Sequence, residues 1–199
     1  MLFVRRFDRL LVEGRLHRVH QESLASVCDL RGFGLPKSQQ TLLRGLRTVV
    51  SNPLGETIEF MLRDVLNLAM RNTDNHARNT AVQRLPDGTV QLTPIFDFAP
   101  MFLDPEIIPR SCHWQASDGK VQCVWMEIIE SLEADDRERS AIAEALHRFA
   151  PKVAALPELA KDCGVEVQII EACRMTIDTQ AQQLDALVAL LPRGKCSNG

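Results

Sequence analysis

The residues best suited to chemistry lie between positions 72 and 97. Asp74 is followed, after four intervening residues, by Asn79, and a second carboxylate, Asp97, comes later between Phe96 and Phe98. An Asp and an Asn at this spacing, with a further Asp downstream, form the set used in phosphoryl transfer. One carboxylate orients the attacking hydroxyl, while an amide oxygen and the other carboxylate hold Mg²⁺ against the phosphates. The spacing therefore predicts a phosphoryl-transfer site.

The stretch between Asn79 and Asp97 predicts a β-hairpin that brings these side chains together. Short apolar runs at 80–82 and 90–92 flank a Pro86-Asp87-Gly88 turn. Because a hairpin returns its two ends to the same place, we expect all three polar side chains to converge on one point. Any one Asp or Asn here could simply stabilise a turn. Taken together, the residues favour a catalytic, or once-catalytic, site.

The residues next to Asp74 and Asp97 have several interpretations. His76 is expected to hold the loop rather than to transfer protons, and Arg78 either contacts phosphate, compensates carboxylate charge or is simply solvated. We expect Phe96 and Phe98 to wedge the Mg²⁺ loop into the core.

Composition excludes several other classes of protein. The chain has 199 residues, 45% of them apolar, and a formal net charge of −3, which suits one soluble domain or lobe and argues against a general nucleic-acid-binding surface. No segment has the pattern of a signal peptide or the apolar length of a membrane span. The six cysteines form no CxxC pair, and Cys112-His113 with Cys123 does not match a zinc spacing. These features predict a reduced, cytoplasmic location.

Apolar periodicity predicts a mainly α fold with a small β-hairpin, in the α+β class. A helix from Asn52-Pro53 to Ala69 is apolar around much of its circumference, and we expect it to be the central buried helix that leads the chain to Asp74. The remaining expected elements are a strand at 1–4, a hairpin around Glu13-Gly14, helices at 21–30, 37–50, 135–149, 154–163 and 165–191, a strand or short helix within 121–129, and irregular chain at 99–119.

Three sequence stretches resemble the C-terminal domain of the HipA-like serine/threonine kinase toxins of bacteria. They are Arg6-Phe7-Asp8-Arg9, His20-Gln21-Glu22, and the pair formed by Asn72-Thr73-Asp74-Asn75-His76-Ala77-Arg78-Asn79 and Leu92-Thr93-Pro94-Ile95-Phe96-Asp97. Their order and separations fit the family, and the resemblance covers nearly the whole chain.

The resemblance implies an ATP- and Mg²⁺-dependent kinase related in fold to the phosphatidylinositol kinases. Asp74 would be the catalytic base, and Asn79 and Asp97 would coordinate Mg²⁺. The segment Arg5-Arg6-Phe7 would form the hinge that receives the adenine of ATP, although the family commonly has an acidic residue where this chain has Arg5. We group His76 and Arg78 with these cofactor-binding residues.

In terms of domains, the resemblance makes residues 1–192 the helical C-lobe of such a kinase. Residues 1–19 would be the hinge and short strands, 20–192 the helical lobe with its hairpin at 80–95, and 193–199 a frayed tail. The N-lobe is expected to be largely absent, since every lysine of the chain lies after the hinge. We therefore expect the chain alone to phosphorylate very slowly or not at all.

The same resemblance suggests partners. They are a protein substrate such as an aminoacyl-tRNA synthetase or another component of translation, a HipB-like DNA-binding antitoxin, and a separate chain that supplies the N-lobe; no direct nucleic-acid or membrane contact is expected. The alternative is a non-catalytic interaction module that binds an antitoxin or a full-length kinase.

Overall fold

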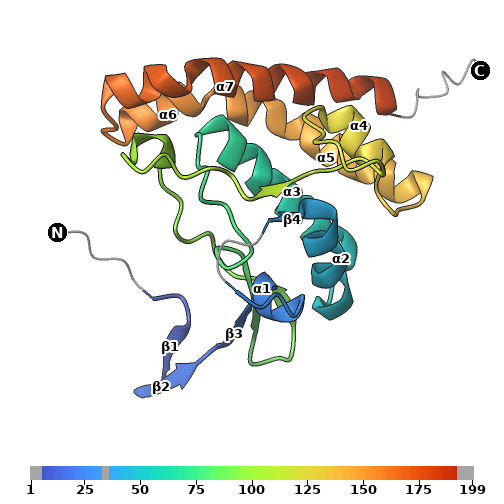
Figure 1. The fold of residues 1–199 in the computed structure, drawn as a ribbon. Helices are drawn as coiled ribbons and strands as arrows, with labels where there is room; N and C mark the ends of the chain where they lie inside the picture. Colours follow the sequence, from blue (N-terminus) through green and yellow to red (C-terminus); the bar gives the residue numbers. More distant parts are fainter. Residues whose placement is uncertain (1–5, 33–35, 192–199) are drawn as a thin grey trace, which may run out of the picture.

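The structure is a computed structural model that describes residues 6–32 and 36–191 (Figure 1). The expected strand at 1–4, the hinge residue Arg5 and the expected tail at 193–199 lie outside the described residues.

Helices make up most of the regular structure, and they surround one central helix. Helices α5 (Asp136–Ala154) and α7 (Val167–Asp185) lie side by side, and α3 (Pro53–Ala69) packs against both (Figure 1). Helix α2 (Gln39–Val49) covers another side of α3, α4 (Trp125–Glu130) packs against α5, and α6 (Leu156–Asp162) connects α5 to α7. Two short 3₁₀ helices lie at Met101–Leu103 and Ala186–Leu190.

Helix α3 is the element that positions the predicted site. It begins where the Asn52 side chain accepts a hydrogen bond from the Gly55 N–H, with Pro53 in the first turn. Its apolar residues, including the fully buried Met61 and Val65, face the core between α2, α5 and α7. The helix ends at Ala69, so the chain reaches Asp74 from a rigid, buried support.

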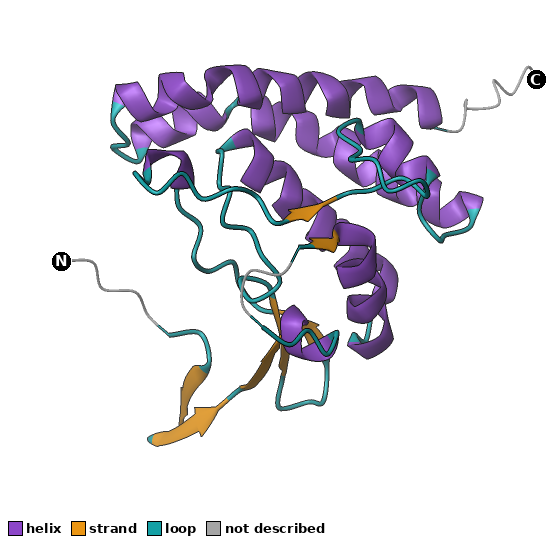
Figure 2. Ribbon diagram, in the orientation of Figure 1, coloured by secondary structure: helices purple, strands orange, loops and turns teal. Residues whose placement is uncertain are grey.

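The strands form three small sheets (Figure 2). Strands β1 (Arg9–Val12) and β2 (Arg15–Arg18) form a hairpin whose turn residues Glu13 and Gly14 both have positive φ, as a two-residue turn of this kind requires. Strands β3 (His20–Ser23), β5 (Ala81–Arg84) and β6 (Val90–Leu92) form an antiparallel sheet in the order β3-β5-β6. Strands β4 (Lys37–Ser38) and β7 (Cys112–His113) pair in parallel. Both predicted hairpins, and the α+β class, are confirmed.

The prediction of a helix at 21–30 is largely wrong. Residues His20–Ser23 are β3, which pairs with β5, and helix α1 covers only Leu24–Val27. Pairing with a strand from far along the chain makes this segment a strand, although its local apolar pattern favours a helix. Helix α5 is also longer than predicted, continuing past Phe149 through Pro151 to Ala154, because Ala150 and Val153 extend its buried face.

Aromatic side chains anchor the core beside α3. Trp114 packs edge-to-face against Phe60 and Trp125, with ring centroids 6.2 Å apart in both pairs. The buried Trp125 Nε1 donates a 2.7 Å hydrogen bond to Gln180 of α7. Within residues 6–32 and 36–191, no helix has both the length and the apolar character to cross a membrane.

The cysteines give a direct test of this packing. Cys123 and Cys163 are exposed, whereas Cys112 and Cys173 are fully buried, and burial raises the pKa of the Cys173 thiol. A buried thiol reacts only after local opening. We therefore expect iodoacetamide to alkylate Cys112 and Cys173 at least about 100-fold more slowly than Cys123 and Cys163. Peptide mass spectrometry would measure each site, and equal rates at Cys112 and Cys123 would contradict the fold.

Candidate catalytic and cation-binding site

The segment after α3 folds back on itself, so that the two ends of the Asp74–Asn79 stretch are joined. The Asp74 carbonyl oxygen accepts hydrogen bonds from the His76 N–H and from the Asn79 side-chain Nδ2, both at 2.9 Å. The Asn79 N–H donates in turn to the His76 carbonyl at 2.9 Å. The conformation that presents Asp74 therefore also fixes the amide group of Asn79.

Asp97 reaches this segment from the far end of the β5–β6 hairpin. Its φ of 54° places it in the left-handed region, a conformation that costs energy for most residues and that often marks a functional position. Asn79 and Asp97 both line a small cavity of about 20 Å³. Asp74 is not among the lining residues, and its Oδ1 lies 3.6 Å from His76 Nε2.

Four asparagines line the same cavity, and each has its side-chain NH₂ group bound to an acceptor of the protein. Asn67 donates to the Arg63 carbonyl, Asn72 to Asn67 Oδ1, Asn75 to Asp64 Oδ1 and Asn79 to the Asp74 carbonyl, at distances of 2.9, 2.8, 3.0 and 2.9 Å. Main-chain carbonyls and an ionised carboxylate only accept hydrogen bonds, so these contacts fix which end of each amide faces them. Asn67 Oδ1 accepts the bond from Asn72, so the amide oxygens available to a ligand in the cavity are those of Asn72, Asn75 and Asn79.

Asn72 provides the clearest sign of a missing neighbour. Its side chain is 3% exposed, and within the described part of the chain its Oδ1 has no hydrogen-bond partner. A buried carbonyl oxygen without a donor is costly. A cavity of about 20 Å³ has room for roughly one water molecule or one ion.

This set of oxygens fits a hard divalent cation. Mg²⁺ prefers oxygen ligands, usually takes only one or two carboxylates from a protein and keeps several of its waters. Amide oxygens and the Asp97 carboxylate are such ligands. Among residues 6–32 and 36–191, no three His, Cys, Asp or Glu side chains come together as a metal cluster, and the charged residues on this cavity's lining are Asp97 and Arg63.

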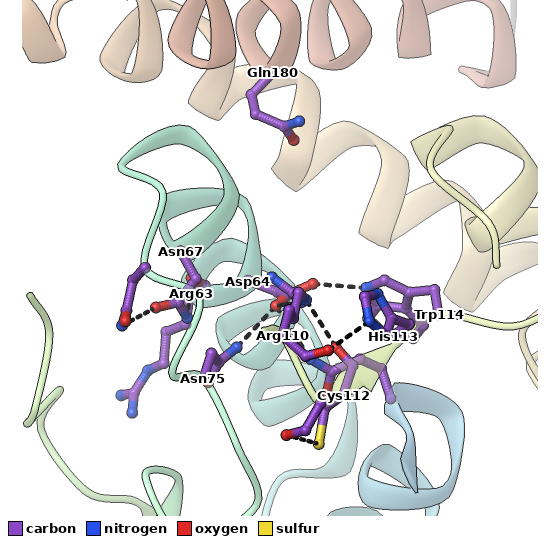
Figure 3. A network of polar contacts seen from close by, with 12 residues as sticks. Arg63, Asp64, Asn67, Asn75, Arg110, Cys112, His113, Trp114 and Gln180 are labelled. Atoms are coloured by element: carbon purple, nitrogen blue, oxygen red, sulfur yellow. Dashed lines mark hydrogen bonds and ion pairs between the residues drawn. The ribbon is translucent and has the colours of Figure 1, made fainter. Parts of the chain in front are cut away.

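A buried polar network lies directly behind this site (Figure 3). Asp64 of α3 is 1% exposed and accepts hydrogen bonds from Trp114 Nε1 at 2.8 Å, from Asn75 Nδ2 at 3.0 Å and from Gln39 Nε2 at 3.2 Å. It also pairs with the Arg110 guanidinium. The sequence patterns did not single out these residues. The sequence does carry one signal for Asp64: it is a carboxylate on the apolar face of a predicted helix. A buried charge requires partners, so such a position indicates a polar network.

The hinge predicted at 5–7 is described from Arg6 onward. The Phe7 ring lies 6.0 Å from that of Phe96, so this segment reaches the loop that carries Asp97. Arg6 donates two 2.8 Å hydrogen bonds to the Asp8 carboxylate, which lower the pKa of that carboxyl. The Arg6 side chain is therefore bound to Asp8, and the Phe7 ring contacts the loop that carries Asp97.

His76 and Arg78 both contact the protein itself. Arg78 Nη2 donates to the Gly32 carbonyl at 2.6 Å, and the Arg78 N–H donates to His76 Nδ1 at 3.2 Å. Since Nδ1 accepts this bond, the proton of a neutral His76 is on Nε2, which faces Asp74. The prediction that Phe98 is wedged into the core is wrong: its ring is 40% exposed, because the chain after β6 runs along the surface.

The observations so far define a mainly helical α+β domain with an asparagine-lined cavity next to an aspartate. The profile of the HipA-like C-terminal domain matches residues 1–156, and the chain belongs to this family.

One solved structure to which the chain is similar is described as the Shewanella oneidensis MR-1 toxin-antitoxin system HipA, HipB and operator DNA complex. The identity is 16% and the TM-score is 0.42, over 94% of this chain and 42% of that chain. The chain thus spans less than half the length of that neighbour. No curated protein matches it.

Proposed function

We propose that the chain is the helical lobe of an ATP- and Mg²⁺-dependent serine/threonine protein kinase of the HipA toxin type. Family membership supports the class of protein. The observation that carries the site is that Asn79 and Asp97, distant in sequence, line one cavity in which the Asn79 amide is held by its bond to the Asp74 carbonyl. Cation ligands next to a separate aspartate are the parts that phosphoryl transfer needs.

Each residue has a distinct role in this proposal. Asp74 orients the attacking hydroxyl of the protein substrate and accepts its proton. His76, with its proton on Nε2, faces the Asp74 carboxylate and helps to hold it. Asn79 and Asp97 would hold Mg²⁺, which supplies positive charge against the phosphates when bound. The segment around Phe7, which contacts Phe96, would receive the adenine.

In the lobe supplied with an N-lobe chain, we expect Asp74→Asn to slow phosphate transfer from radiolabelled ATP by roughly 10²–10⁴-fold, the usual contribution of a general base. The same variant should keep its Mg²⁺ affinity, because Asp74 does not line the cavity. Transfer that persists at the rate of the unmodified chain would reject Asp74 as the base.

The lobe alone is proposed to be weakly active or inactive, because positioning of the phosphates supplies most of the catalysis and here would depend on an N-lobe. Calorimetry of Mg²⁺-dependent ATP binding, with and without an added N-lobe chain, tests this. If nucleotide binds neither to the lobe alone nor to the lobe with the N-lobe chain, the kinase proposal is rejected.

A second candidate function is that of a non-catalytic interaction module, and the β1–β2 hairpin favours it. Leu11 and Leu16 face each other across the hairpin and are 70% and 61% exposed. An isolated two-stranded hairpin is marginal in water, and exposed apolar strands are typical binding surfaces. Candidate partners are a HipB-like antitoxin or a full-length kinase, and the substrate of an active assembly would be a protein of translation. Replacing both leucines with Ser should abolish partner binding but not cation binding.

A further inference from the structure

Asn75 lies at the one point where the buried network and the candidate cation cavity meet. Its side chain lines the cavity, and its Nδ2 donates to Asp64 Oδ1 at 3.0 Å (Figure 3). It directly follows Asp74, the proposed base. No other residue that lines the cavity donates a side-chain hydrogen bond to Asp64 among the described contacts.

Asp64 is held far more firmly than the loop it contacts. It comes from the middle of α3, is 1% exposed, and receives donors from α2, from Arg110 and from Trp114. Arg110 is itself fixed through a 2.8 Å bond from its Nε to the Cys112 carbonyl of β7. The carboxylate therefore joins three separate segments and offers a rigid acceptor to the Asn75 amide.

We propose that Asp64 is a positioning residue for the cation site and acts through Asn75. By accepting the Asn75 NH₂ group, it fixes the backbone next to Asp74 and turns the Asn75 carbonyl oxygen toward the cavity, where it binds the cation or one of its waters. The inference rests on the proposed function, since it concerns the same site. It adds Asn75 to the residues that hold the cation.

The charge of Asp64 makes this orientation specific. A neutral side chain at position 64 could accept from one end of the Asn75 amide and donate to the other. An ionised carboxylate can only accept, so just one amide orientation satisfies it. Outer partners that orient a ligand in this way are typically worth 10–100-fold in metal affinity.

The test compares Asn75→Ala with Gln39→Ala, each of which removes one amide donor to the same Asp64 oxygen. Only the first touches the site segment. Electron paramagnetic resonance of free Mn²⁺ would measure cation affinity on the 199-residue chain. We expect Asn75→Ala to weaken Mn²⁺ binding by about 10-fold or more. Gln39→Ala, although it opens the core, should change that affinity by less than about 2-fold.

Hydrogen exchange supplies a second readout that needs no ligand. The amides of His76 and Asn79, which are bound within the loop, should exchange about 10-fold faster in Asn75→Ala and remain at the starting rate in Gln39→Ala. Equal effects of the two variants on affinity and exchange, or no effect of Asn75→Ala on either, would overturn the inference. If the unmodified chain binds no Mn²⁺, the proposed function fails, and the exchange rates still decide whether Asp64 positions the loop.

Discussion

Asp97→Asn should weaken Mn²⁺ or Mg²⁺ binding by about 100-fold while leaving the fold intact. Even replacing a residue that only orients a metal ligand lowers metal affinity by about 10–100-fold. The substitution removes the one carboxylate among the cavity's lining residues. It should not disturb the backbone, because Asn is among the few residues that adopt a left-handed conformation readily and Asp97 has a φ of 54°. Loss of binding without loss of stability would thus report on the charge alone.

The matched control is Asp87→Asn. Asp87 lies in the turn between β5 and β6, on the same hairpin but remote from the cavity, and its substitution removes the same formal charge. Titration of Mn²⁺ and thermal unfolding would be followed for both variants. Similar small changes in cation affinity for the two would mean that Asp97 contributes only to the general field of the protein and would remove it from the site.

Asp64→Asn should lower the free energy of unfolding by about 3–5 kcal/mol, as expected when one partner of a buried ion pair is removed. The carboxylate accepts hydrogen bonds on both oxygens, so an amide must present its NH₂ group to at least one donor. It also leaves Arg110 without its counter-charge in a buried position. For a chain of this size the melting temperature should fall by about 10 °C.

A charge on the same helix serves as the control for this variant. Glu59 pairs with Arg63 at 2.7 Å but is substantially exposed, so Glu59→Gln should cost less than about 1 kcal/mol. Adding Arg110→Met to Asp64→Asn should recover part of the lost stability, because the unpaired charge is then removed. Urea unfolding measures all three. An Asp64→Asn variant as stable as the Glu59→Gln control would show that the network carries little energy.

The sequence was sufficient for the parts of the fold that depend on local signals. The hairpin around Glu13-Gly14 and the hairpin carrying Pro86-Asp87-Gly88 follow from turn residues, and α3 follows from its apolar period and its Asn52-Pro53 start. Strand β3 could not be found in this way. Its partner, β5, lies some sixty positions later, and pairing across that distance overrides the local pattern.

For the candidate site, spacing could indicate Asp74, Asn79 and Asp97 but not what supports them. Asp64 has no motif, and its partners Gln39, Arg110 and Trp114 come from unrelated parts of the chain. Such a network is visible only after the fold brings its members together. The orientation of the asparagine amides is likewise a property of hydrogen-bond geometry, which residue types alone do not encode.

The carboxylate on the cavity lining has a consequence for what can enter the cavity. Each lining amide binds the protein through its NH₂ group, which fixes its orientation, and Asp97 carries the negative charge of the lining. A phosphorylated molecule close to Asp97 would be repelled by this carboxylate unless a cation arrived with it or before it. Nucleotide and divalent ion should therefore bind with mutual dependence, each raising the affinity for the other by an equal factor.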